Sequence, residues 1–359
     1  MGGSISLRQA LTEEYRSHRP MRPVDLLKLV YQNEFGCGHL IEDSHGALSR
    51  LVEEERNLTT VGRKGCDYTL IGNGLARLHL RAAARTGLDI KTLYRFFLLS
   101  GREMRGSESG FLQKTEELCS LCQNGYFSFS RGEVMRLVEE WEESGKRPFS
   151  HSELYRRAWQ PAYRVVEQKY CDFLPLFAAI DTRLRQKERV ILAIDGNCGA
   201  GKSTLAALLK EVYECAVIPA DDFFLQMHQR TEERLREVGG NLDRERLLRE
   251  VLEPLRRGEN HVSYRPFDCS CGALGDAVTI PDGNLFVVEG SYSMHRHLAP
   301  LYDLSVFCGV NPREQMRRIR SRSGEEMAKR FEEVWIPMEN AYFAGENIKE
   351  KCDLVFETE

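Results

Sequence analysis

The chain has 359 residues, of which 42% are hydrophobic and 29% are charged, and it carries a formal net charge of −4. A chain of this length is expected to form about two domains. The acidic balance disfavours nucleic acid as a partner, and no apolar run approaches the length of a membrane span, so no membrane is expected either. The eleven cysteines follow a start that does not resemble a secretory leader, and they are expected to be reduced thiols of a cytoplasmic protein.

Residues 1–187 are predicted to form a mainly helical domain of unknown role. A short strand or turn is expected around residues 68–71. The predicted helices cover residues 7–18, 24–35, 44–55, 75–85, 89–100, 110–122, 131–145, 150–159, 162–170 and 172–187.

Three polar clusters in this half contain side chains that are candidates to line a pocket. These side chains are His39, Asn73, Arg77, His79, His151, Tyr155, Arg156, Tyr163 and Arg164. Two interpretations stay open. The favoured one is structural, because helical proteins need polar residues at caps and in hydrogen bonds between helices. The other is a second ligand or partner site, whose ligand the residue types do not identify.

Residues 188–359 alternate strand and helix and are predicted to form a separate domain. Strands are expected at residues 190–194, 215–219, 285–288, 304–307 and 353–356, with a minor strand at 277–280. Five strands separated by helices predict a parallel, doubly wound sheet with right-handed crossovers, which is an α/β fold. In such sheets ligands bind beyond the carboxyl ends of the strands.

Residues 196–203 read G-x-x-x-x-G-K-S between a predicted strand and a predicted helix, which is the context of a phosphate-binding P-loop. The glycines let backbone N–H groups point into one concavity, and the helix N-terminus adds further donors. Lys202 is expected to reach the β- and γ-phosphates and Ser203 to bind Mg²⁺, so ATP and Mg²⁺ are the expected cofactors. The expected nucleotide-binding residues are Gly196, Asn197, Cys198, Gly199, Ala200, Gly201, Lys202, Ser203 and Thr204.

Carboxylates follow two of the other predicted strands. Asp221 is placed where a carboxylate accepts the proton of an attacking hydroxyl, and Glu289 is suited to bind Mg²⁺. A late helix carries Arg317, Arg318, Arg320 and Arg322, and one or two of them are expected to neutralise transition-state charge together with Lys202. Which of the four acts stays open, with Arg318 and Arg322 as the chosen candidates. The bland alternatives are a helix cap for Asp221 and a solvated helix face for the arginines.

These motifs occur in an order that resembles the uridine kinase and nicotinamide riboside kinase group of P-loop kinases. The similar segments are GNCGAGKST at the loop, VIPADDFF around Asp221, NLD ending at Asp243, the pair Phe267-Asp268, VVEG around Glu289, and the arginine helix with the Trp335-Ile336-Pro337 segment after it. The resemblance covers residues 188–359 and implies that Asp221 is the catalytic aspartate. It also implies that Asp243 holds hydroxyls of the acceptor and that Phe224, Phe267 and Asp268 lie near it.

The sequence departs from this group at one position of the acceptor site. The histidine that helps those enzymes to read a nucleoside base is missing after Phe267-Asp268, where residues 269–272 read CSCG. The expected activity is transfer of a phosphate from ATP to a hydroxyl of a small molecule, with a nucleoside favoured. The open alternatives are an ATP-driven switch or binding module and a kinase acting on another polyol or, through the helical domain, on RNA. A homo-oligomer also stays open.

Overall fold

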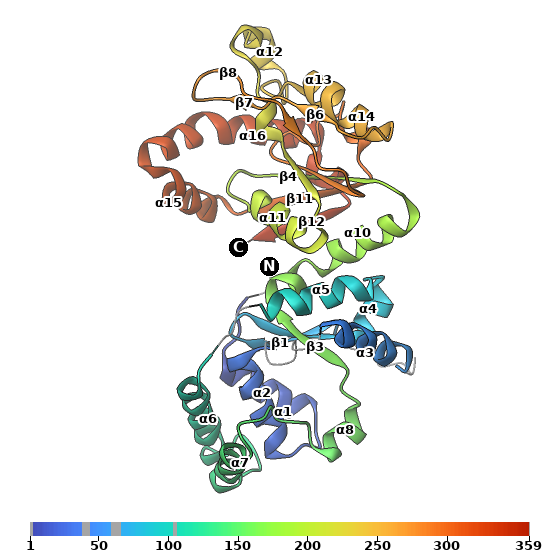
Figure 1. Ribbon diagram of the computed structural model, residues 1–359. Coiled ribbons are helices and arrows are strands. Elements are labelled where there is room, and N and C mark those ends of the chain that lie inside the picture. Colours follow the sequence, from blue (N-terminus) through green and yellow to red (C-terminus); the bar gives the residue numbers. More distant parts are fainter. Residues whose placement is uncertain (1–2, 38–43, 59–65, 103–105, 359) are drawn as a thin grey trace. The chain divides into compact units, whose positions relative to one another are not determined.

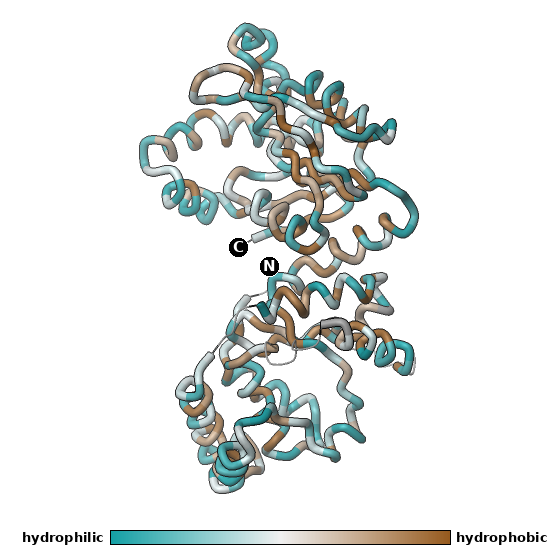
Figure 2. Tube along the Cα trace, viewed as in Figure 1, coloured by the Kyte–Doolittle hydropathy of each residue, from teal (hydrophilic) through white to brown (hydrophobic). Residues whose placement is uncertain are grey.

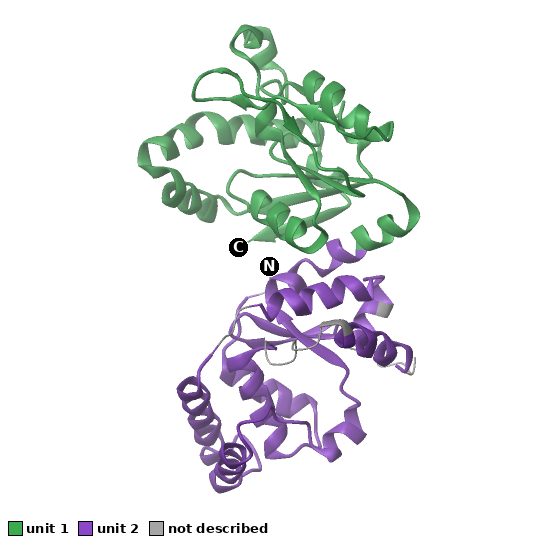
Figure 3. Ribbon diagram, in the orientation of Figure 1, with its two compact units in different colours: residues 1, 179–359 green, residues 2–178 purple. Residues whose placement is uncertain are grey.

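The computed structural model describes residues 3–37, 44–58, 66–102 and 106–358, and the chain forms two compact units, residues 2–178 and residues 179–359 (Figure 3). We call them the N-terminal unit and the C-terminal unit. The division lies within helix α10 (Leu174–Gln186), whereas the predicted boundary follows residue 187. His39, a predicted pocket residue, lies outside the described residues.

The N-terminal unit is mostly helical, as predicted, and its helices pack around a small antiparallel sheet (Figure 1). The sheet has the order β1-β2-β3 and consists of Tyr68–Gly72, Leu75–His79 and Tyr163–Glu167. The helices before α10 are α1 Leu7–Ser17, α2 Pro23–Phe35, α3 Ser44–Arg56, α4 Leu80–Thr86, α5 Ile90–Ser100, α6 Glu108–Gln123, α7 Arg131–Glu143, α8 Glu153–Trp159 and α9 Gln168–Asp172.

Two of these strands replace predicted helices, at residues 75–85 and 162–170. The reason at β2 is a tight turn: Asn73 and Gly74 both have positive φ angles, 55° and 69°, and join β1 to β2 as a hairpin. Leu78 then pairs with Tyr68 on one side and with Arg164 of β3 on the other. This pairing overrides the helical propensity of the leucine, alanine and arginine in β2, because tertiary contacts outweigh a weak local preference.

The C-terminal unit is built on a five-stranded parallel sheet in the order β12-β11-β4-β10-β5. The strands are β4 Val190–Gly196, β5 Ala216–Pro219, β10 Leu285–Glu289, β11 Leu304–Val310 and β12 Leu354–Thr358. The chain leaves the central strand β4 toward β5 on one side and later returns to β11 and β12 on the other. The doubly wound α/β P-loop fold that the sequence predicts is therefore confirmed.

Helices and short strands connect the sheet strands. The helices are α11 Lys202–Tyr213, α12 Glu232–Arg236, α13 Arg244–Leu247, α14 Glu253–Arg256, α15 Pro312–Arg330, α16 Ile336–Glu346 and α17 Ile348–Lys351. A π-helical turn, Leu248–Leu252, joins α13 to α14. The short strands β6 Ser263–Tyr264 and β9 Val278–Thr279 pair with each other, as do β7 Phe267–Asp268 and β8 Ala273–Leu274.

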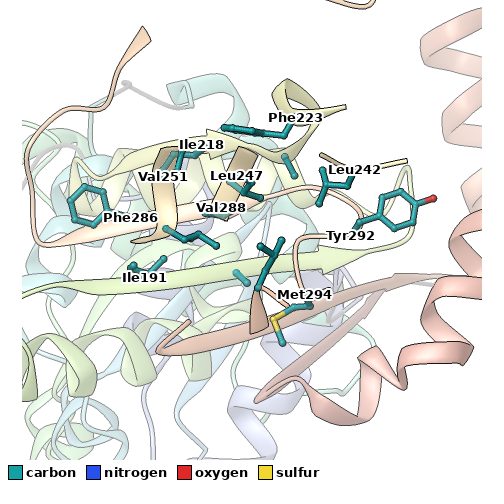
Figure 4. Close-up of a cluster of buried hydrophobic side chains, with 14 of the residues drawn as sticks. Ile191, Ile218, Phe223, Leu242, Leu247, Val251, Phe286, Val288, Tyr292 and Met294 are labelled. Carbon is teal, nitrogen blue, oxygen red and sulfur yellow. The ribbon is translucent and has the colours of Figure 1, made fainter. Parts of the chain in front are cut away.

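The core of the C-terminal unit lies between this sheet and the segment from α13 to α14 (Figure 4). Ile191, Ile218 and Val288 from the strands pack with Leu247 and Val251 from that segment, and all five side chains are buried. The central strands are apolar along their length, whereas the outer helices are mixed (Figure 2). Burying a side chain of this kind contributes about 1.5–3 kcal/mol to the stability of the fold. This core therefore holds in place the strands whose carboxyl ends carry the polar residues.

Candidate active site

The loop from the end of β4 to the start of α11 depends on its glycines. Gly196, Gly199 and Gly201 have φ angles of 132°, 74° and 93°, which other residues rarely adopt. A Cβ atom at Gly196 would also overlap the carbonyl group of Cys308 on the neighbouring strand β11. The loop therefore has the curled backbone that presents N–H groups to phosphate oxygens.

Lys202 is the first residue of α11, and its side chain folds back over this loop. The ammonium Nζ donates to the carbonyl oxygens of Gly196 at 2.7 Å and Asn197 at 3.0 Å, and to Ser291 Oγ at 3.2 Å. A lysine ammonium has three donors, and all three are used in these contacts. They hold the Lys202 ammonium at the loop, where the oxygens of a bound polyphosphate would compete with the present acceptors.

Ser203 and Glu289 come together as the predicted metal-binding pair. The hydroxyl of Ser203 donates to Glu289 Oε2 at 3.3 Å. Burial raises the pKa of Glu289 above its ordinary value, and the nearby carboxylates of Asp221 and Asp222 add to the rise. The pair offers the hard oxygen ligands that Mg²⁺ prefers, and the crowded negative charge favours a cation there. These residues fit the ion.

Asp221 begins a 3-10 turn, Ala220–Phe223, directly after β5. Its side chain keeps access to solvent, although the protein around it displaces enough water to raise its pKa above the ordinary value. Glu339 and Asp222 raise this pKa further, while Lys202 and Arg322 oppose the rise. Asp221 is thus close enough to Lys202 and Arg322 for both positive charges to affect its pKa.

The two arginines of α15 that are assigned to catalysis differ from each other in their contacts. Arg318 donates from Nη1 to the carbonyl oxygen of Gly199 in the loop at 3.1 Å, and Arg322 lowers the pKa of Asp221. Arg318 also pairs through Nε with Glu314 of its own helix at 2.7 Å, as Arg317 does, and Arg320 pairs with Glu325. The helix is interrupted at Gly324, whose φ of 79° lies outside the helical region.

The four predicted acceptor residues lie in three different settings. Asp243 is buried and caps α13, since its Oδ1 accepts from Arg246 N at 3.1 Å and its Oδ2 from Gln229 Nε2 at 2.9 Å. Phe267 is buried, and the exposed Asp268 accepts two hydrogen bonds from Ser270 in its own turn. Phe224 is half-buried and forms an isolated β-bridge with Leu242.

A backbone hydrogen bond connects the segment that contains Asp243 to the turn that contains Asp221. The backbone N–H of Asp243 donates to the carbonyl of Phe223 at 2.7 Å, which ties the start of α13 to the turn that carries Asp221. Each Asp243 oxygen thus already accepts one hydrogen bond within the protein.

Two residues at the loop were not predicted. Glu339 of α16 is buried and accepts from the backbone N–H of Cys198 at 3.0 Å and from Ser291 Oγ at 2.6 Å. Gln315 of α15 is also buried and donates from Nε2 to the carbonyl of Cys198 at 3.0 Å. No local pattern marks either residue, because a helix far along the chain can supply such a brace from any of its turns.

Asp195, the residue before the loop, is the third residue of this site that was not predicted from the sequence. It is fully buried and accepts four hydrogen bonds, from the backbone N–H groups of Gly196, Tyr292 and Met294 and from the hydroxyl of Tyr342, at 2.7–3.2 Å. Burial nevertheless raises its pKa from 3.8 to about 6. Asp195 ties the end of β4 to the segment after β10.

Replacing Asp195 with asparagine is expected to lower the free energy of unfolding of the C-terminal unit by about 1–3 kcal/mol at pH 8, because an amide cannot accept all four bonds. Since the folded-state pKa is raised, the wild type loses stability as the pH rises from 3.8 to about 6. Asparagine does not titrate, so the gap between wild type and variant should widen toward pH 4.

Urea unfolding followed by the fluorescence of Trp335, with Trp141 and Trp159 replaced by phenylalanine, measures this gap at pH 4.5 and pH 8. The exposed aspartate Asp276 offers the control, because Asp276→Asn should leave the unfolding curve in place. A gap that narrows on acidification would mean that the pKa of Asp195 is not raised.

Within the ranges that the structure describes, no helix is both long and apolar enough to cross a membrane. The same residues contain no group of three or more histidine, cysteine, aspartate or glutamate side chains arranged to hold a metal ion. Any Mg²⁺ at Ser203 and Glu289 would therefore need phosphate oxygens and water as its other ligands.

No protein-family profile matches the chain, and no curated protein matches it. Solved structures of kinases do. A possible uridine kinase from Bacillus stearothermophilus is 20% identical, with a TM-score of 0.37, over 50% of this chain and 98% of that one. A proposed fructose transport system kinase from Silicibacter sp. TM1040 is 21% identical, with a TM-score of 0.39, over 50% of this chain and 95% of that one.

The shikimate kinase from Bacteroides thetaiotaomicron is 19% identical, with a TM-score of 0.26, over 47% of this chain and 85% of that one. Each of these matches covers about half of this chain. Identities and TM-scores this low carry no substrate from those proteins to this one, and what the site does must follow from its own residues.

Proposed function

We propose that the C-terminal unit transfers the γ-phosphate of ATP to a hydroxyl group of a small molecule, with a nucleoside as the favoured acceptor. One observation carries this proposal. Asp221, with its raised pKa, lies within electrostatic reach of both Lys202 of the P-loop and Arg322 of α15. A base, a phosphate-binding lysine and a further cation near the base are the parts that phosphoryl transfer to an alcohol requires.

In the proposed reaction the acceptor oxygen attacks the γ-phosphorus, and a new P–O bond forms as the bond to the β–γ bridging oxygen breaks. The hydroxyl proton passes to Asp221, and ADP leaves. Lys202 exchanges its loop carbonyl partners for phosphate oxygens, and the loop N–H groups hold the β-phosphate. Mg²⁺, when bound at Ser203 and Glu289, would offset charge on the β- and γ-phosphates.

Arg318 and Arg322 have separate parts in this proposal. Arg318 braces the loop through the carbonyl of Gly199, and Arg322 lies free of any carboxylate partner among the described residues. Among the described residues, Arg322 Nε donates to Ser323 Oγ at 3.4 Å, and the ring centroid of Phe331 is 5.8 Å from the guanidinium carbon. It is the cation best placed to move onto the transferred phosphate.

A panel of nucleosides and simple polyols, each incubated with ATP and Mg²⁺, should contain at least one compound that raises ADP formation well above the acceptor-free rate. Coupled detection of ADP, followed by mass spectrometry of the phosphorylated compound, makes the measurement. Slow ATP hydrolysis that no acceptor increases would instead support an ATP-driven switch. The same assay with a short RNA distinguishes a kinase that acts on a macromolecule.

A further inference from the structure

A pocket of about 550 Å³ opens in the N-terminal unit, far along the sequence from the P-loop. Helices α2, α3, α4 and α8 and the segment before α8 contribute its lining. Lys28, Arg81 and Arg156 are three cationic side chains in that lining, each from a different helix. The volume lies within the range of small-molecule sites.

The three cations lack anionic partners. No carboxylate lies within ion-pair distance of Lys28, Arg81 or Arg156 in the part of the chain that the structure describes. Among the described residues, Lys28 donates to the carbonyl of Phe149 at 2.7 Å, and the buried Nε of Arg81 has no hydrogen-bond partner there. A buried guanidinium nitrogen without a hydrogen-bond acceptor lowers the stability of the fold. A bound ligand could supply the acceptor that the described residues do not.

The one carboxylate of the described lining does not neutralise them. Glu54 is bound instead by Arg164, whose Nη2 lies 2.7 Å from Oε2. His151 contributes no charge at neutral pH, because burial lowers its pKa to about 4. Its ring nitrogens contact Asp25 Oδ1 at 3.1 Å and the hydroxyl of Tyr163 at 2.7 Å.

Burial and nearby positive charges both disfavour the charged form of Lys28. The pKa of Lys28 is lowered to about 8, mainly by burial and then by the positive charge of Arg77; Asp25 opposes the fall, and Arg156 makes a smaller contribution to it. Like charges gathered without a counter-charge destabilise a fold, and a bound anion would relieve this cost.

We propose that this pocket is a binding site for a small phosphorylated molecule, with its phosphate held by Lys28, Arg81 and Arg156. Phosphate chemistry suits the three groups, because a guanidinium binds two phosphate oxygens at once and an ammonium binds as a point charge. The pocket is large enough for an organic group beside the phosphate. This proposal does not depend on the reaction proposed for the C-terminal unit.

The test uses the full chain with Lys202→Met, which weakens phosphate binding at the P-loop. Isothermal titration with pyrophosphate and with ribose 5-phosphate, at constant ionic strength, measures affinity. Hydrogen exchange with and without the probe locates the site. We expect slower exchange in α4, in α8 and in residues 149–152, and an affinity about tenfold weaker in Arg156→Gln. Because Arg156 is exposed, this replacement should not disturb the fold.

Arg157→Gln is the matched control. Arg157 follows Arg156 on α8, is exposed, and pairs with Glu153 rather than lining the pocket. It should bind the probes as the parent does, and Arg81→Gln should lose affinity in the same way as Arg156→Gln. Equal loss of affinity in Arg157→Gln, exchange protection confined to residues 196–204, or no binding of either probe by the parent would each overturn the proposal.

Discussion

Replacement of Asp221 with asparagine is expected to lower the rate of phosphoryl transfer by about 10²–10⁴-fold, which is the usual contribution of a positioned general base. Asparagine keeps the shape of the side chain but cannot take the proton of the attacking hydroxyl. The rate is measured as acceptor-dependent ADP formation at saturating ATP. ATP affinity should change little, because Lys202 and the loop hold the phosphates.

The pH dependence gives a second readout of the same residue. Because the pKa of Asp221 is raised above the ordinary value of 3.8, the wild-type rate should fall on acidification at a higher pH than a free aspartate would predict. That acid limb should shift or vanish in Asp221→Asn. Asp276→Asn, at an exposed position of the same unit, is the control and should retain both rate and limb. A loss of less than tenfold in Asp221→Asn would show that another group is the base.

Much of this site could be predicted because its geometry follows from strand ends. In a parallel sheet all carboxyl ends lie at one edge, so residues that directly follow apolar runs, such as Asp221 and Glu289, are expected near the P-loop. The loop itself is a local motif whose glycines are needed for backbone reasons. Neither inference requires knowledge of contacts between distant segments.

The remaining parts of the site depend on such contacts. Glu339 and Gln315 reach the loop only because α16 and α15 pack beside it, and nothing in their local sequence differs from an ordinary helix face. Asp195 looks like a strand-end residue, and its four donors come from three separate segments. A sequence shows which groups are polar but not which donors will surround them.

The same limit applies to the N-terminal unit. Of the predicted pocket residues, Arg156 and His151 line the cavity, while Arg77 and Tyr163 belong to a hydrogen-bonded network beside it. Lys28 and Arg81 were not predicted, because charged residues on amphipathic helices are usually solvated and their convergence is a tertiary fact.

That network is the setting of the largest expected effect on stability. Glu14 of α1 and Arg77 of β2 are 3% and 2% exposed, and Arg77 Nη1 lies 2.8 Å from Glu14 Oε1. Tyr155 donates its hydroxyl to the same oxygen at 2.8 Å, and Gln32 Oε1 accepts from Arg77 Nε at 2.9 Å. Burial alone would raise the pKa of Glu14, yet Arg77, His18 and Tyr155 together hold it far below its ordinary value.

Glu14→Gln should therefore lower the free energy of unfolding of the N-terminal unit by about 3–5 kcal/mol at pH 7, because it leaves the guanidinium of Arg77 buried without a counter-charge. Urea unfolding followed by Trp141 and Trp159, in a chain with Trp335→Phe, reports this unit alone. The exposed neighbour Glu13 provides the control, since Glu13→Gln should leave stability within about 0.5 kcal/mol of the parent.

The sign of the pH dependence separates a charge effect from a packing effect. A depressed folded-state pKa means that ionised Glu14 stabilises the fold above pH 4.5 and that this stabilisation is lost as the pH falls further. The gap between the parent and Glu14→Gln should thus narrow below pH 4.5. The double variant with Arg77→Met should cost less than the sum of the single changes, because removing both charges leaves neither one buried alone. Additive costs, or a gap that does not change with pH, would show that Glu14 and Arg77 stabilise the unit through packing and hydrogen bonds and not as a charge pair.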